Sequence, residues 1–295
     1  MPRFLQVILA AVSFGTRFRG PVKPADSGLF AAALALQPAV GLWLGLAAAV
    51  LPMFLTVNFR GLQGLMLFAS GIYLFLLEWL TRFDGLHEFD SACRMLAGAN
   101  IPPEERIQRR SQPGSSPCTP MLIGLKFLLL YLIFMRTALF GDHMMLAVTL
   151  VSVPFFGRIA MLFAYPSGEK NAPSAGVVIK VFWTLLALFL LAFLLGLLRT
   201  YGGDFFSFRT MKLTMSGFGD RSGGGVPPFI ALVSLGVQDT FSFFAAGYLT
   251  VMYWNTEAAK KLKERPSPFF AGALCETAEL AAMVIFLILA DDLIF

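Results

Sequence analysis

The sequence is short of charged residues. Asp, Glu, Lys and Arg make up 14% of its 295 residues, whereas hydrophobic residues make up 57%. A soluble domain of this length needs more charge than that on its surface, so the composition excludes an ordinary soluble protein. The formal net charge is +5. No basic run resembles a nucleic-acid-binding footprint, and we expect no nucleic-acid partner.

Cysteine and histidine are scarce as well. Cys93, Cys118 and Cys275 show no Cys-x-x-Cys spacing and no even-numbered framework, so the sequence predicts free thiols. His87 and His143 are too few to build a zinc site by themselves. These absences leave carboxylates as the main candidates for metal binding.

Long apolar runs are abundant instead. Several reach the ~20 residues that a helix needs to cross the hydrocarbon layer of a membrane. The sequence therefore predicts an all-α polytopic transmembrane helix bundle that forms one integral membrane domain over 1–295. The expected spans, about seven, are 29–57, 61–80, 121–139, 144–165, 177–198, 228–254 and 269–290.

Two polar segments interrupt the apolar runs. Segment 81–118 is rich in Arg and Pro, and segment 199–226 is a Gly/Ser-rich insertion. With the amino terminus inside, most loop Lys and Arg residues fall on the cytoplasmic side, as the positive-inside rule requires. We therefore expect a multi-pass protein of the cell inner membrane, in contact with lipid, with segment 81–118 in the cytoplasm. The first span contains Gln37-Pro38, which predicts a kink.

Segment 81–118 opens with three carboxylates. Asp84 and Glu88 are four residues apart, so on a helix they share one face and their oxygens can converge on a hard cation such as Mg²⁺. Asp90 lies about 240° round from Asp84 at 100° per residue and joins them only through a bend or a neighbouring loop. A solvated helix start with acids near its amino end is the structural alternative.

Ionisable residues inside predicted spans form a second candidate group. Inserting one charged side chain into a membrane span costs ~2.5–3.5 kcal/mol, so each such residue needs a partner or a function. Arg158 lies in the fourth span, and Glu276 and Glu279 share a helix face in the seventh. A salt link from Arg158 to one glutamate is the structural interpretation, and a role in holding substrate or metal is the functional one. Asp239, in the sixth span, is more simply explained by a polar contact or a water-lined cavity.

Four segments, in order, resemble the cobalamin synthase family, the adenosylcobinamide-GDP ribazoletransferases. Segment 12–18 is similar to the family's Ser-Phe-x-Thr-Arg opening, and segment 83–88 to its His-Leu-Asp-Gly-Leu-Ala-Asp signature. Arg158 with segment 161–166 resembles its Arg-containing helix that ends in a Tyr-Pro-type turn. Segment 272–280 looks like its Gly-Ala-x-x-Glu-x-x-Glu. The likeness covers most of the chain outside the insertion.

The resemblance implies a Mg²⁺-dependent membrane transferase. Such an enzyme joins GDP-activated adenosylcobinamide to α-ribazole, or to its 5′-phosphate, and releases GMP. By this resemblance Asp84, Glu88 and Asp90 are the expected metal ligands and catalytic acids. The expected substrate-binding residues are Arg109, Arg110, Arg158, Glu276 and Glu279. For Arg109 and Arg110, a solvated positive loop is the structural alternative.

The sequence also departs from the family pattern. Arg82 stands where the family has His, Glu88 where it has Asp, and Arg110 where it has an acid. Other functions therefore stay open: a non-catalytic membrane subunit or binding protein on the same fold, and a transporter. A CDP-alcohol phosphotransferase also begins with Asp-Gly, but its Asp-Gly-x-x-Ala-Arg continuation is missing here. Homo-oligomers and assemblies with other membrane subunits are both compatible with the sequence.

Overall fold

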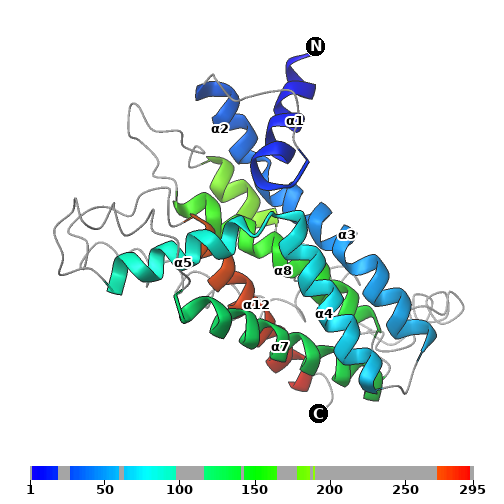
Figure 1. The fold of residues 1–295 in the computed structure, drawn as a ribbon. Helices are drawn as coiled ribbons and strands as arrows, with labels where there is room; N and C mark the ends of the chain where they lie inside the picture. The colour runs from blue at the N-terminus through cyan, green and yellow to red at the C-terminus, as the bar shows by residue number, and fades with distance from the viewer. Residues whose placement is uncertain are drawn as a thin grey trace, which may run out of the picture.

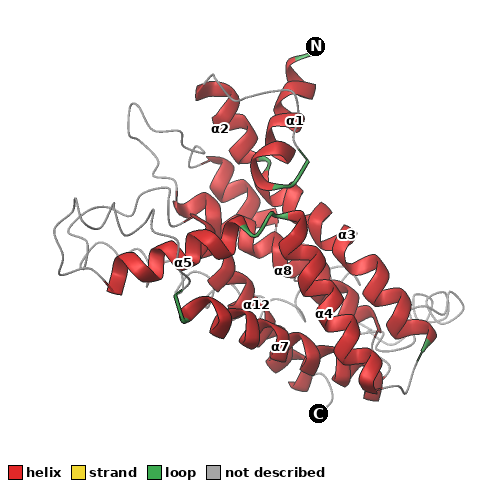
Figure 2. Cartoon of the chain, in the orientation of Figure 1, coloured by secondary structure: helices red, strands yellow, loops and turns green. Residues whose placement is uncertain are grey.

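The computed structural model is helical wherever it describes regular structure, which confirms the predicted all-α class (Figure 2). We label the helices as in Figure 1. The described residues are 2–18, 27–59, 63–97, 116–140, 143–164, 178–186, 189 and 271–292. The named helices are α1 (Arg3–Gly15), α2 (Ser27–Ala35), α3 (Gln37–Asn58), α4 (Gln63–Leu80), α5 (Asp84–Ala97), α7 (Cys118–Phe140), α8 (His143–Ala164) and α12 (Ala271–Asp292).

Within the described ranges, three helices are long and apolar enough to cross a membrane: α3, α7 and α12. A fourth span results if α4 and α5 are taken together, although these two helices meet at an angle of 83°. The structure therefore supports a membrane protein with three or four spans in its described part. The predicted span 228–254, the insertion 199–226 and most of span 177–198 lie outside the described residues.

The predicted kink at Gln37-Pro38 is a complete break between α2 and α3. Pro38 lies in the first turn of α3, where its missing N–H costs no helical hydrogen bond and its fixed φ suits a helix start. Helices α1 and α2 pack against each other and extend away from the rest of the bundle (Figure 1). The first long apolar run is thus one short helix followed by one long one.

The sharp turn between α4 and α5 has an unusual backbone. Arg82 and Phe83 both take positive φ angles, of 61° and 60°, a region that non-glycine residues rarely adopt. The Phe83 N–H donates to the carbonyl of Glu78 (2.8 Å), and the Arg17 N–H donates to the carbonyl of Leu80 (2.7 Å). These bonds satisfy orphan carbonyls at the end of α4. The turn redirects the chain so that α5 begins at Asp84.

Helix α12 lies at the centre of the arrangement and packs against α8, α5 and α7 (Figure 1). Helix α8 also packs along α3, and two glycines let these helices approach closely. A β-carbon at Gly41 would lie 2.6 Å from the Pro154 carbonyl oxygen, and one at Gly45 would lie 2.7 Å from that of Val151. Small residues at such crossings are typical of membrane helix pairs. The packing places α4, α5, α8 and α12 around a common space.

Candidate functional site

A cavity of about 280 Å³ opens where α4, α5, α8 and α12 meet. Its wall carries five carboxylates and one guanidinium, a high density of charge for the inside of an apolar bundle. The lining residues are Phe14, Leu77, Glu78, Thr81, Asp84, Gly85, Glu88, Arg158, Met161, Ala271, Gly272, Cys275, Glu276 and Glu279.

The cavity brings together the acids of two distant segments. Asp84 and Glu88 come from the first turns of α5, and Glu276 and Glu279 come from α12. Within each pair the spacing places both side chains on one helix face, as the sequence predicts. Asp84 is exposed, Glu88 is half-buried, and the two α12 glutamates are buried.

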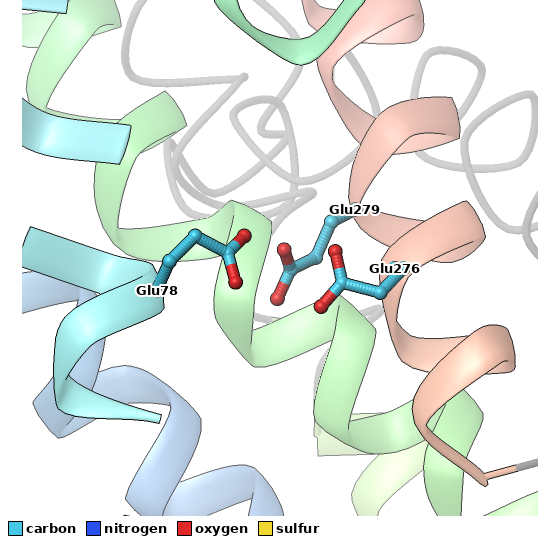
Figure 3. Close-up of side chains that lie close together, drawn as sticks. All are labelled: Glu78, Glu276 and Glu279. Carbon is cyan, nitrogen blue, oxygen red and sulfur yellow. The ribbon is translucent and has the colours of Figure 1, made fainter. Parts of the chain in front are cut away.

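A buried ammonium group organises three glutamates. The Lys126 Nζ, on α7, lies 3.3 Å from Glu78 Oε1 and 2.7 Å from Glu279 Oε2, and it also donates to Glu276 Oε2. Lys126 has no exposed surface. Figure 3 shows the three carboxylates converging, Glu78 from α4 and the other two from α12. Loss of the cation from a buried ion pair leaves an uncompensated charge, at a cost of about 3–5 kcal/mol, so Lys126 stabilises the three glutamates.

The sequence does not by itself predict the roles of Glu78 and Lys126. Lys126 falls within a predicted span, and lysines near span ends can extend to the interface, but its side chain is fully buried in the bundle. Glu78 stands at the end of the second predicted span, where a glutamate side chain can reach water and therefore needs no buried partner. The available signal is that Lys126 lies inside a predicted span, where an ionisable residue needs a partner.

Three glycines allow the cavity glutamates to lie directly against neighbouring backbone. At each of these positions a β-carbon would overlap or crowd a glutamate side chain from another helix. The three pairs are Gly85 with Glu276, Gly157 with Glu279, and Gly272 with Glu88. In the third pair the Gly272 N–H also donates to Glu88 Oε2, at 2.5 Å. The glutamates are therefore fitted closely between the helices that carry these glycines.

Arg158 connects the cavity to the amino-terminal helices. Its Nη1 donates to Gln37 Oε1 (3.0 Å), and Gln37 Nε2 donates in turn to the carbonyl of Ala11 (2.9 Å). These bonds run from α8 through the break between α2 and α3 to α1. Lys126 pairs with both α12 glutamates, a partnership that the sequence does not predict.

Asp90, the third predicted metal ligand, connects α5 to the start of α7. Its Oδ1 accepts hydrogen bonds from the Ser116 N–H (2.5 Å) and the Thr119 hydroxyl (3.0 Å). Its Oδ2 pairs with Arg94 at 2.8 Å. Asp90 is not among the residues that line the cavity. The structure thus brings Asp84 and Glu88 to the cavity and gives Asp90 other partners.

The remaining candidates have simpler outcomes. His87 is exposed on α5 and does not line the cavity. Arg109, Arg110 and Asp239 lie outside the described residues. The cysteines are free, as predicted, and Cys275 Sγ lies on the cavity wall 3.6 Å from Glu279 Oε1.

The residues that line the cavity suit a hard divalent cation. Mg²⁺ binds oxygen ligands, usually one or two carboxylates, and keeps several waters. Asp84 and Glu88 supply such carboxylates one turn apart on the exposed side of the cavity. If all five acids are ionised, Arg158 and Lys126 together neutralise only two of the five negative charges. In that charge state the cavity attracts cations, and it accepts a phosphate group only if cations accompany that group.

Comparison with known proteins adds no assignment. No family model, no curated protein and no solved structure matches this chain.

Proposed function

We propose that the protein is a membrane-embedded, Mg²⁺-dependent phosphotransferase, and specifically an enzyme of the cobalamin synthase type. It would join GDP-activated adenosylcobinamide to α-ribazole, or to ribazole 5′-phosphate, and release GMP. One observation carries the proposal: residues from all four segments that resemble this family line a single cavity, although the segments are far apart in the sequence.

Each segment contributes at least one side chain or backbone position to the cavity wall. The contributions are Phe14 from the first segment, Asp84, Gly85 and Glu88 from the second, Arg158 and Met161 from the third, and Gly272, Cys275, Glu276 and Glu279 from the fourth. A chance likeness in four short motifs would not be expected to converge on one site. Polar groups that converge on one concave cavity are the usual sign of an active site.

The chemistry requires groups that this cavity offers. A ribazole hydroxyl attacks the phosphorus that bears the cobinamide, the bond to the GMP oxygen breaks, and the hydroxyl proton passes to a base. When bound, Mg²⁺ neutralises charge on the phosphate oxygens and on the leaving group. Asp84 and Glu88 would hold the ion, Arg158 would bind a phosphate oxygen, and a carboxylate of the wall would accept the proton.

The cavity volume limits what it encloses. About 280 Å³ is near the lower end of the range for small-molecule sites, which is roughly 300–1,000 Å³. A corrinoid ring is much larger, so we propose that only the reacting diphosphate and the ribazole hydroxyl enter while the corrinoid stays at the membrane surface. The same proposal includes about seven spans in the cell inner membrane, with the acidic segments of α5 and α12 facing the cytoplasm.

A transferase agrees better with the distribution of acids than a transporter does. The cavity acids lie in the last turn of α4, the first turns of α5 and the first half of α12. They therefore gather at one end of the described bundle, whereas a transport path needs polar groups along the whole depth of the membrane.

The test is turnover by the purified protein in detergent with Mg²⁺, GDP-activated adenosylcobinamide and each ribazole form. GMP release together with formation of the joined corrinoid product would support the proposal, and chelation of the metal should stop both. Absence of product with both ribazole forms, from protein that stays folded and monodisperse, would refute it and favour a non-catalytic membrane subunit.

A further inference from the structure

The Lys126 ammonium occupies a position that has the geometry of a metal site. The ligand oxygens of Glu78, Glu276 and Glu279 all lie within 4.8 Å of one another. Oxygens on opposite sides of a bound cation are about 4.0–5.2 Å apart for Mg²⁺ and Ca²⁺, given metal–oxygen distances of roughly 2.0–2.6 Å. A divalent ion therefore fits among the same three carboxylates that now hold the ammonium.

The cluster also has acceptor capacity that Lys126 does not use. Glu78 is 4% exposed and lines the cavity, and its Oε2 is buried without a hydrogen-bond donor in the described part of the chain. Buried carboxylate oxygens normally accept hydrogen bonds or bind ions. If all three carboxylates are ionised, one ammonium leaves two negative charges, of which Arg158 on the same cavity balances one.

We propose that Glu78, Glu276 and Glu279 form a divalent-cation site, separate from Asp84 and Glu88, in which Lys126 is a tethered competitor. Lysine carries its charge on a flexible four-carbon stem, so the ammonium can withdraw when an ion enters from the cavity. The ammonium keeps the three glutamates in place without metal, and it lowers their affinity for a divalent ion. The site takes hard cations of the Mg²⁺, Mn²⁺ or Ca²⁺ class.

Mn²⁺ binding measures this competition without any substrate. All proteins would carry Asp84→Asn and Glu88→Gln, so that the other carboxylate pair does not contribute, and free Mn²⁺ would be followed by electron paramagnetic resonance. Lys126→Met, which removes the charge and keeps the length, should bind one Mn²⁺ per chain at least tenfold more tightly than the parent. Lys126→Arg keeps the charge and should bind like the parent.

A second variant and a second measurement complete the test. Adding Glu78→Gln to Lys126→Met should abolish the gained ion, and Mn²⁺ should raise the melting temperature of Lys126→Met above its value in chelator. If Lys126→Met is recovered unfolded in chelator, refolding on addition of Mn²⁺ supports the site. The proposal is overturned if Mn²⁺ neither binds more tightly to Lys126→Met nor stabilises it, or if the added Glu78→Gln leaves the gain unchanged.

Discussion

Gly85 lies directly against the carboxylate of Glu276, so that a β-carbon at position 85 would overlap Glu276 Oε1. This contact joins the first turn of α5 to α12, and it holds a glutamate that also accepts from Lys126. The glycine is needed for space rather than for backbone freedom. The start of α5 can therefore pack this closely against Glu276 on the cavity wall only because residue 85 has no β-carbon.

Gly85→Ala should displace Glu276 from Lys126 and lower both stability and activity. Forcing a methyl group into this contact is expected to cost about 1–3 kcal/mol, because the Glu276 carboxylate is held and does not move freely. Thermal unfolding in detergent and GMP release measure the two effects. Gly124→Ala on α7 is the matched control, since a β-carbon there meets no atom within 4 Å. An equally small effect of both substitutions would contradict this account.

Asp84→Asn should abolish turnover without loss of stability. Its carboxylate is exposed at the cavity and is a proposed Mg²⁺ ligand, so we expect a loss of on the order of 10²–10³ in kcat/KM. The melting temperature should stay close to that of the unaltered protein. Residual activity near the original level would remove Asp84 from the proposed site.

Asp90→Asn should show the opposite pattern. Loss of the charged acceptor for the Ser116 N–H, the Thr119 hydroxyl and Arg94 is expected to destabilise the protein by about 1–3 kcal/mol. Folded Asp90→Asn protein should keep most of its turnover and its Mg²⁺ dependence. A loss as large as that of Asp84→Asn, at an unchanged melting temperature, would restore Asp90 as a third metal ligand.

Gln37→Leu should weaken the connection between α1 and the cavity. The substitution removes an acceptor of Arg158 Nη1 and the donor to the Ala11 carbonyl, and each buried group that loses a hydrogen bond costs about 1–3 kcal/mol. Gln37→Glu provides the comparison, because it keeps an acceptor for Arg158 and loses only the donor. We expect Gln37→Glu to melt above Gln37→Leu, and the reverse order would show that the Arg158 contact is unimportant.

Substitutions at Arg82 should report the cost of the turn between α4 and α5. An L-residue in the left-handed region costs roughly 1–2 kcal/mol, and asparagine tolerates that region better than most residues. Arg82→Asn should therefore raise the free energy of unfolding slightly, whereas the β-branched Arg82→Val should lower it. Chemical denaturation of both variants measures the difference, and equal stabilities would mean that the positive φ is not retained in solution.

Much of the helical framework could be predicted from the sequence. The apolar runs that contain α3, α7 and α12 are long and uninterrupted, and such runs form helices in lipid because the backbone has no other hydrogen-bond partners. The break before α3 follows from Pro38, which has no N–H to continue a helix from α2 but fits the first turn of a new one. Spacing alone places Asp84 and Glu88 on one helix face.

The internal arrangement of the site could not be predicted in the same way. Spacing along one helix says nothing of which neighbour it faces, so the partnership of Lys126 with acids 48, 150 and 153 residues away is not visible in the sequence. The turn at Arg82 and Phe83 contradicts the local preferences of both residues, because their positive φ angles are rare outside glycine. Asp90 follows cavity residues in the sequence, yet its hydrogen bonds go to the start of α7.

The Lys126 cluster has a consequence for how the chain enters the membrane. Helix α4 carries Glu78 and emerges first, α7 then brings Lys126, and the two charges can cancel each other at that stage. Glu276 and Glu279 arrive only with α12, which follows both of these helices in the chain. A chain that is released before α12 therefore lacks both the central helix of the described bundle and two of the three acids around the ammonium.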